Sequence, residues 1–220
     1  MLYPLNIDLA GRLVIVVGGG TVAERKVSGL LAAEADISVR VIAPNVTPNL
    51  RMMASAKKIR WIKENYAQNM LKGAFLVYAA TNEYSVNMAV ADEAKVCGAL
   101  VNVIDDPSAS SFQVPSSIRR NELLITVSTG GRSPALSRAM RMELEQIYPQ
   151  SFGLWLERIK KLRTELKKKD LSSEHRTLFW RVAMRSDILS MVRDGELEKA
   201  EVELRNAALN IRAQSSDCSG

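Results

Sequence analysis

One stretch of this 220-residue chain decides its fold: Leu13-Val14-Ile15-Val16-Val17-Gly18-Gly19-Gly20-Thr21-Val22-Ala23-Glu24-Arg25-Lys26. Five apolar residues end in three glycines and continue directly as a helical pattern, which is the context that a dinucleotide fingerprint requires. In the spacing Gly18-x-Gly20-x-x-Ala23, the first glycine permits a tight turn, the second lets the backbone approach a pyrophosphate, and the small alanine lets helix and strand pack closely. The N–H groups at the helix start then face the anion. The stretch therefore predicts a dinucleotide cofactor.

The acid that usually follows this fingerprint is absent. It is expected about 20 residues further on, at the end of the second strand, where it binds the ribose hydroxyls. Here the second strand, residues 37–42, ends in Ala43-Pro44, and Asp36 precedes the strand and so lies at its wrong end. Ribose contacts therefore have to come from the backbone or from elsewhere. The choice between NAD and NADP is therefore not settled by an acid.

Strands and helices alternate strictly over the first 105 residues. This order predicts a Rossmann-like α/β fold, with a parallel sheet and helices on both faces. Right-handed crossovers bring the carboxyl ends of all strands to one edge, where such sheets bind ligands. Expected strands are 12–17, 37–42, 59–63, 75–80 and 100–104, expected helices are 21–33, 47–55 and 84–96, and the loops at the binding edge are 18–20, 43–44, 80–82 and 105–107.

The pattern changes after residue 107. Two strands, 112–118 and 123–128, are expected to pair through residues 119–122. Ser133 as helix cap and Pro134 in the first helical position start a helix over 135–148. Beyond it the chain is all helical, at 152–169, 173–184 and 186–208, and an interruption of the last helix near Gly195 is the alternative. We therefore expect three parts: a dinucleotide-binding domain over 1–110, a small α+β segment over 111–149 and a helical domain over 150–220.

Composition limits the partners and the location of the chain. Thirty Lys and Arg against 24 Asp and Glu give a net charge of +6, which suggests an anionic partner. No apolar run approaches the roughly 18 residues of a membrane span, and the first residues lack a secretory signal. We therefore expect a cytoplasmic protein. Cys97 is expected to be a small buried thiol and Cys218 to lie in a polar tail, and neither spacing suits a metal site.

Three further segments join the fingerprint: Leu100-Val101-Asn102-Val103-Ile104-Asp105-Asp106-Pro107, Phe112-Gln113-Val114-Pro115, and Val127-Ser128-Thr129-Gly130-Gly131-Arg132-Ser133-Pro134. This ordered set resembles the precorrin-2 dehydrogenase family, which includes stand-alone enzymes of siroheme synthesis and the amino-terminal module of the fused siroheme synthases. The resemblance covers residues 1 to about 148, and the helical remainder is similar in length and type.

The resemblance implies oxidation of precorrin-2, a tetrapyrrole with eight carboxylates, to sirohydrochlorin with NAD⁺ as hydride acceptor. It also implies a homodimer formed through the central segment. Some family members insert Fe²⁺ as well, and the sequence leaves that activity open. An anionic substrate suits the arginines near the glycine-rich turns, because guanidinium pairs bidentately with carboxylate; they are Arg119, Arg120, Arg132, Arg138 and Arg141.

The resemblance also assigns roles to individual residues. Asp105 matches the functional aspartate of the family, and a carboxylate there can take a ring proton. The alternative role, capping the Asp-Asp-Pro turn, suits Asp106 better. Cofactor-binding residues are Gly18, Gly20, Thr21, Val22, Ile42, Ala43, Thr81 and Asn102, and substrate-binding residues are Ser128, Thr129, Gly130 and Arg132, whose turn could equally be a plain helix entry.

Some positions depart from the family pattern. Thr129 stands where certain fused relatives carry a phosphorylatable serine, and Asn82 stands where an acid often follows Ala-Thr. His175, the sole histidine, is expected on the surface of the helical part, with metal handling as the less favoured alternative.

Two other classes of protein compete with this interpretation. A nucleotide-sensing Rossmann regulator would normally carry the second-strand acid and would not need the 128–134 turn. A nucleic-acid-binding protein would account for the pI of about 9.4, but the basic residues are not interleaved with aromatic ones and no helix-turn-helix or zinc pattern is present.

Overall fold

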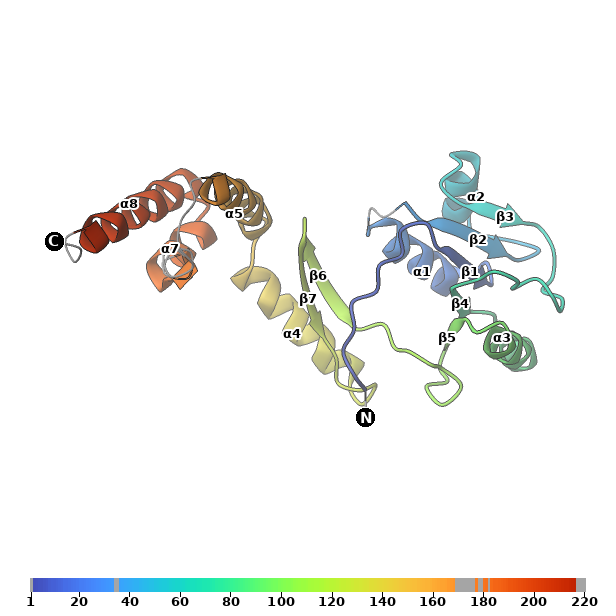
Figure 1. The fold of residues 1–220 in the computed structure, drawn as a ribbon. Helices are drawn as coiled ribbons and strands as arrows, with labels where there is room; N and C mark the ends of the chain where they lie inside the picture. Colours follow the sequence, from blue (N-terminus) through green and yellow to red (C-terminus); the bar gives the residue numbers. More distant parts are fainter. Residues whose placement is uncertain (1, 34–35, 169–176, 178–179, 182, 217–220) are drawn as a thin grey trace. The chain divides into compact units, whose positions relative to one another are not determined.

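The computed structural model describes residues 2–33, 36–168, 177, 180–181 and 183–216 (Figure 1). The chain divides into two compact units, Met1–Val114 and Pro115–Gly220. His175, Cys218 and most of the helix expected at 173–184 lie outside the described residues.

The first unit is a five-stranded parallel sheet with the order β3-β2-β1-β4-β5. The order reverses between β1 and β4, and this makes a switch point at the carboxyl edge of the sheet. The expected Rossmann-like α/β fold is thereby confirmed. Its elements are β1 Leu13–Val17, α1 Thr21–Leu31, β2 Ser38–Ile42, α2 Pro48–Ser55, β3 Arg60–Ile62, β4 Leu76–Ala79, α3 Tyr84–Val96 and β5 Leu100–Val103.

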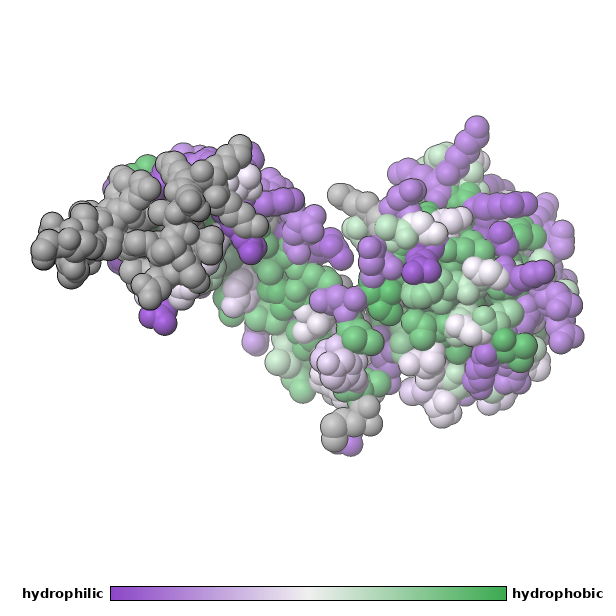
Figure 2. Space-filling view, viewed as in Figure 1, coloured by the Kyte–Doolittle hydropathy of each residue, from purple (hydrophilic) through white to green (hydrophobic). Residues whose placement is uncertain are grey.

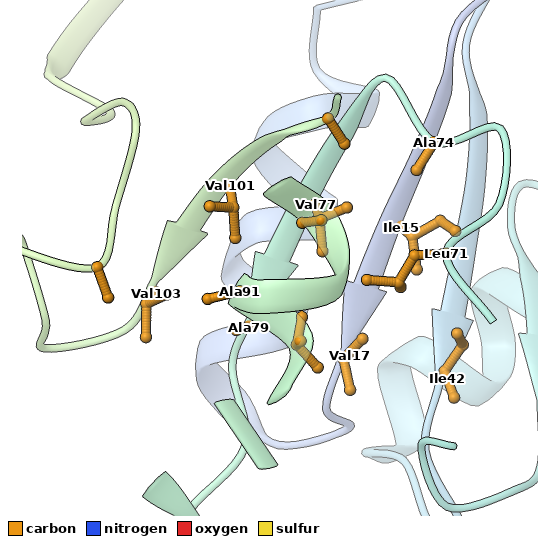
Figure 3. Packing of buried hydrophobic residues seen from close by; sticks show 14 residues of the cluster. Ile15, Val17, Ile42, Leu71, Ala74, Val77, Ala79, Ala91, Val101 and Val103 are labelled. Atoms are coloured by element: carbon orange, nitrogen blue, oxygen red, sulfur yellow. The ribbon is translucent and has the colours of Figure 1, made fainter. Parts of the chain in front are cut away.

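Both faces of this sheet are buried. Alternate residues of β1 enter two separate cores: Ile15 and Val17 pack toward α3, as Figure 3 shows, and Val14 and Val16 pack toward α1 and α2. A central strand buried on both sides has to be apolar throughout, which accounts for the uninterrupted run that opens the fingerprint. The two cores hold the carboxyl ends of β1 and β4 side by side.

The second unit joins a hairpin to a set of helices. Strands β6 Ser116–Arg120 and β7 Leu123–Val127 pair antiparallel. A helical core forms around Trp155 of α5 and Leu204 of α8, both at most 2% exposed. No helix within the described ranges is long and apolar enough to cross a membrane. The helices are α4 Pro134–Ile147, α5 Ser151–Lys168, α7 Ser186–Arg193 and α8 Leu197–Ser216.

Three expectations about local structure were wrong or incomplete. Residues 112–115 are not a strand. Phe112 packs edge-on against Tyr78, which belongs to the same unit, and Pro115 has no N–H to donate in a strand ladder. The hairpin turns at Asn121, which has φ +53°, so β6 extends to Arg120. The helix expected over 186–208 is interrupted at Gly195, the alternative noted above, because this glycine adopts φ +80°.

Cys97 is exposed and not buried as expected. It follows the last residue of α3, Val96, which is itself 88% exposed, and it lies beyond the buried stripe that ends at Ala94. Gly98, with φ +69°, then turns the chain toward β5.

Two helical glycines, Gly153 in the second unit and Gly29 in the first, allow the packing of α5 on β6 to be tested with a matched control. A Cβ at Gly153 of α5 would lie 2.5 Å from the Arg120 backbone oxygen, whereas a Cβ at Gly29 of α1 would meet nothing within 4 Å. We expect Gly153→Ala to lower the free energy of unfolding by about 1–3 kcal/mol through overpacking, and Gly29→Ala to raise it by up to about 1 kcal/mol through helix propensity. Urea unfolding measures both. Equal stability of Gly153→Ala and the wild type would contradict the described packing of α5 on β6.

Candidate functional site

Four loops follow the carboxyl ends of β1, β2, β4 and β5 and form the edge that contains the switch point. They carry Gly18–Gly20, Ala43, Thr81 and Asp105, so the fold collects the predicted cofactor residues and the predicted base on one edge of the first unit. The predicted turn over 128–132 belongs to the second unit.

The three glycines after β1 have different physical roles. Gly18 has φ +124°, and a Cβ there would lie 2.2 Å from the Ala80 carbonyl oxygen. A Cβ at Gly19 would lie 1.9 Å from the Asn45 carbonyl oxygen. Gly20 has φ −81° and ψ −173°, which any residue adopts, and a Cβ there would meet nothing within 4 Å. Gly18 and Gly19 are therefore needed by the fold, whereas Gly20 leaves open space that a ligand can use.

The amino end of α1 faces this space. Gly20 is the helix cap, and it offers no side-chain hydrogen bond to the first N–H groups of the helix. Thr21 is exposed, Val22 is half-buried and Ala23 is fully buried against the sheet. Uncapped N–H groups at a helix start bind anions such as a pyrophosphate. The residues present thus fit a dinucleotide at this turn.

The end of β2 has its backbone already engaged. Ile42 accepts a hydrogen bond from the Gly18 N–H at 2.9 Å, and Ala43 donates its N–H to the Ile62 oxygen at 3.1 Å. The Trp61 indole N–H also donates to the Ala43 oxygen, at 2.9 Å. Both side chains are buried, so these two residues can support a ligand site mainly by holding the end of β2 in place. Asn45 was not predicted as a site residue from the sequence. It follows β2 and has an exposed amide side chain.

The loop after β4 is held by a buried amide. Asn87 of α3 is 4% exposed, and its Oδ1 accepts hydrogen bonds from the Thr81 N–H at 3.1 Å and from the Thr81 hydroxyl at 2.8 Å. Its Nδ2 donates to the Thr81 oxygen at 3.0 Å. Sequence reasoning missed Asn87; the signal was an amide on the apolar face that also carries Val90 and Ala94.

The two acids after β5 differ sharply. The Asp106 carboxylate accepts hydrogen bonds from the Ser108 hydroxyl at 2.5 Å and from the N–H groups of Ser108 and Ala109, each at 3.0 Å. The Ser108 hydroxyl and the Ala109 N–H are the main causes that lower the pKa of Asp106. Asp105 is exposed and has φ +56°, a left-handed conformation that a non-glycine residue rarely adopts. Among the hydrogen bonds of the described residues, none engages its carboxylate.

Asn102 lies on β5 opposite Tyr78 of β4. It is half-buried, and its Nδ2 donates to the Phe112 oxygen at 3.1 Å, which leaves Oδ1 available. Burial raises the pKa of Tyr78 to about 12, so this phenol remains neutral at physiological pH. The amide thus anchors the chain that leaves β5, on the same sheet edge as Asp105.

The predicted substrate turn is organised around Thr129. The hydroxyl of Thr129 donates to the Ser133 oxygen and accepts from the Ser133 N–H, both at 3.1 Å. Gly130 donates its N–H to the Ser128 hydroxyl at 3.2 Å. Thr129 therefore has a structural task at the helix entry, whereas Ser128 and Arg132 are exposed and able to meet a ligand.

A groove of about 820 Å³ opens elsewhere, at the amino edge of the same sheet. Its lining includes Asp36, Lys57 and Ile59, which precede β2 and β3, so it lies opposite the glycine turn. Within the part of the chain that the structure describes, no group of three or more His, Cys, Asp or Glu residues could hold a metal ion.

The parallel sheet, its switch point and the glycine turn at an uncapped helix start define a Rossmann-like dinucleotide-binding protein. Consistent with this, a family model described as NAD(P)-binding matches residues 5–116. The chain belongs to that family.

Comparison with known proteins reveals chains similar to this one among siroheme synthases. The chain is 36% identical over 201 residues to a siroheme synthase of Photorhabdus laumondii and 38% identical over 202 residues to one of Neisseria meningitidis serogroup C. These alignments cover 91% and 92% of this chain but 42% of each relative, so the chain spans about two fifths of their length. The solved structure of SirC, a precorrin-2 dehydrogenase, has the same fold, with a TM-score of 0.73 and 23% identity over 93% of this chain and all of SirC.

The open position at Gly20 gives a direct test of the cofactor site. We expect Gly20→Val to fold, because the backbone there is extended and its surroundings are empty, but to fill the space that a pyrophosphate needs. Calorimetry should show the Kd for NAD⁺ rising by about a hundredfold or more, equivalent to ~3 kcal/mol. Gly20→Ala should show a smaller loss. Unchanged affinity in both variants would exclude the glycine turn as the pyrophosphate site.

Proposed function

We propose that this protein oxidises precorrin-2 to sirohydrochlorin with NAD⁺. One observation carries the proposal: an uncommitted carboxylate, Asp105, follows β5 on the sheet edge that also carries the glycine turn. The names of the siroheme synthase and SirC relatives support tetrapyrrole chemistry. A regulator that only senses nucleotides would not need such a carboxylate.

In the proposed site, the amino end of α1 binds the pyrophosphate through the N–H groups that follow Gly20. Ile42 and Ala43 hold the end of β2 in place beneath the cofactor, and the Asn45 amide is suited to a ribose hydroxyl. We favour NAD over NADP because no Lys or Arg occurs between β2 and Arg51 to meet a 2′-phosphate.

The oxidation removes a hydride and a proton from the substrate. When bound, NAD⁺ supplies the hydride acceptor. Asp105 then accepts a ring proton of the substrate as a general base, and its freedom from internal hydrogen bonds keeps both oxygens available for that task. Asp106 holds the turn that presents Asp105. Asn102 orients the substrate or the cofactor beside this carboxylate.

The acidic substrate needs cationic and N–H groups around it. We propose that Ser128, Gly130 and Arg132 bind its carboxylates, with Thr129 holding their turn in shape. The net charge of +6 supports an anionic substrate. Our proposal also keeps the cytoplasmic location that the sequence predicts, and it leaves metal insertion as a separate activity to be assayed with Fe²⁺.

We further propose that the chain forms a homodimer through the segment 111–149, between a cofactor domain over 1–110 and a helical domain over 150–220. A two-stranded sheet is marginal by itself, and the helix on it carries an exposed apolar stripe, Leu136, Met140 and Ile147. Figure 2 displays hydrophobic residues gathered over α4 and the hairpin. Such a patch is typical of a subunit interface.

The dimer is testable by mass. Met140→Glu introduces a charge into the stripe, and we expect sedimentation or light scattering to report a monomer where the wild type gives a dimer. Gln146→Glu adds the same charge to α4 outside the stripe and should remain dimeric. A Met140→Glu chain that stays dimeric, or a monomeric wild type, would contradict the proposed interface.

The role of Asp105 is tested best by Asp105→Asn, because asparagine tolerates the left-handed conformation that alanine would resist. We expect anaerobic turnover of precorrin-2 with NAD⁺ to fall by at least about a hundredfold, the range that general-base catalysis contributes. Calorimetric affinity for NAD⁺ should be nearly unchanged. Turnover like that of the wild type would remove Asp105 from the mechanism.

A further inference from the structure

We infer that Asn87 is a positioning residue for the dinucleotide site, acting through Thr81; this inference rests on the proposed function. Asn87 and Ser137 are the buried polar residues within the described part of the chain. A buried amide is costly unless it is hydrogen-bonded, so its presence in the apolar face of α3 calls for a physical reason.

The reason is a three-bond clamp on one loop residue. Asn87 receives the N–H and the hydroxyl of Thr81 and donates to its carbonyl oxygen, with distances of 2.8–3.1 Å. The Thr81 hydroxyl also accepts the Glu83 N–H at 3.2 Å, which ties the clamp to the start of α3. Thr81 thus has its N–H, its hydroxyl and its carbonyl oxygen engaged inside the protein. It shapes the site and has little left for direct contact with a ligand.

The clamp acts next to the glycine turn. Ala80, the neighbour of Thr81, donates its N–H to the Val17 oxygen at 2.8 Å, and its own carbonyl oxygen lies 2.2 Å from the position that a Cβ of Gly18 would take. The backbones of Gly18 and Ala80 are therefore in close contact between the ends of β1 and β4. A shift of Thr81 would move this contact, which lies at the switch point where a dinucleotide crosses the sheet edge.

Four variants separate positioning from stability. Asn87→Ala deletes the clamp, and Thr81→Val removes the hydroxyl with little change of shape. Thr81→Ser keeps the hydroxyl. Val90→Ala, fully buried on the same face of α3, should destabilise the helix without touching the loop.

We expect the calorimetric Kd for NAD⁺ to rise about tenfold in Asn87→Ala and severalfold in Thr81→Val. A tenfold change corresponds to the net contribution of about one hydrogen bond. Thr81→Ser and Val90→Ala should bind as the wild type does. The double variant Asn87→Ala/Thr81→Val should have the same Kd for NAD⁺ as Asn87→Ala, because the two residues act as one unit. In the protein without ligand, exchange of the Thr81 amide proton should be slow in the wild type and fast in Asn87→Ala.

The outcomes separate this inference from the proposed function. Failure of the wild type to bind any nicotinamide dinucleotide would overturn the proposed function and this inference together. Wild-type binding with unchanged affinity in Asn87→Ala and Thr81→Val would overturn this inference alone. An equal loss of affinity in Val90→Ala and Asn87→Ala would also overturn it, because general destabilisation would then explain both. Thr81→Val decides the matter by itself if Asn87→Ala does not fold.

Discussion

The first unit depends on one close approach, that of the glycine turn to the loops on either side of it. The chain after β1 passes between the Ala80 and Asn45 carbonyl oxygens with no room for a side chain at Gly18 or Gly19. This contact fixes the start of α1, because Gly20 caps that helix directly afterwards. It also brings the ends of β2 and β4 to the same place. The binding edge is thus a product of backbone packing, and the side chains around it are added to a frame that is already set.

At this edge, neighbouring residues of the same type have different roles, one structural and one available for chemistry. Of two adjacent aspartates, Asp106 is engaged by three hydrogen bonds that shape the turn, and Asp105 remains uncommitted in a left-handed conformation. Backbone strain of this kind is common where a side chain has to be presented for function. The same separation recurs in the second unit, where Thr129 is engaged internally and its neighbours Ser128 and Arg132 are exposed. In the first unit Thr81 is likewise engaged internally.

The sequence allowed the sheet and the switch point to be predicted because apolar strand runs and glycine spacing are local signals. The buried residues Val14–Val17 of β1 and the positive φ of Gly18 both follow directly from these residue types. Contacts between distant residues left no such signal. Phe112 looked like part of a strand because its packing on Tyr78 is a tertiary contact. The role of Asn87 could not be predicted from its place on an apolar helix face. Its hydrogen bond with Thr81 forms only when the loop after β4 packs against α3. Cys97 looked buried because the helical pattern extends one turn further than the core does.

The proposed hydride transfer from the tetrapyrrole to the nicotinamide is measured most directly with an isotope. Precorrin-2 with deuterium at the carbon that is oxidised should be converted anaerobically with NAD⁺, and the reduced cofactor examined by NMR. We expect deuterium on the nicotinamide ring, with one reduced cofactor for each sirohydrochlorin formed. Sirohydrochlorin that appears without a reduced cofactor, with the deuterium lost to water, would contradict the claim.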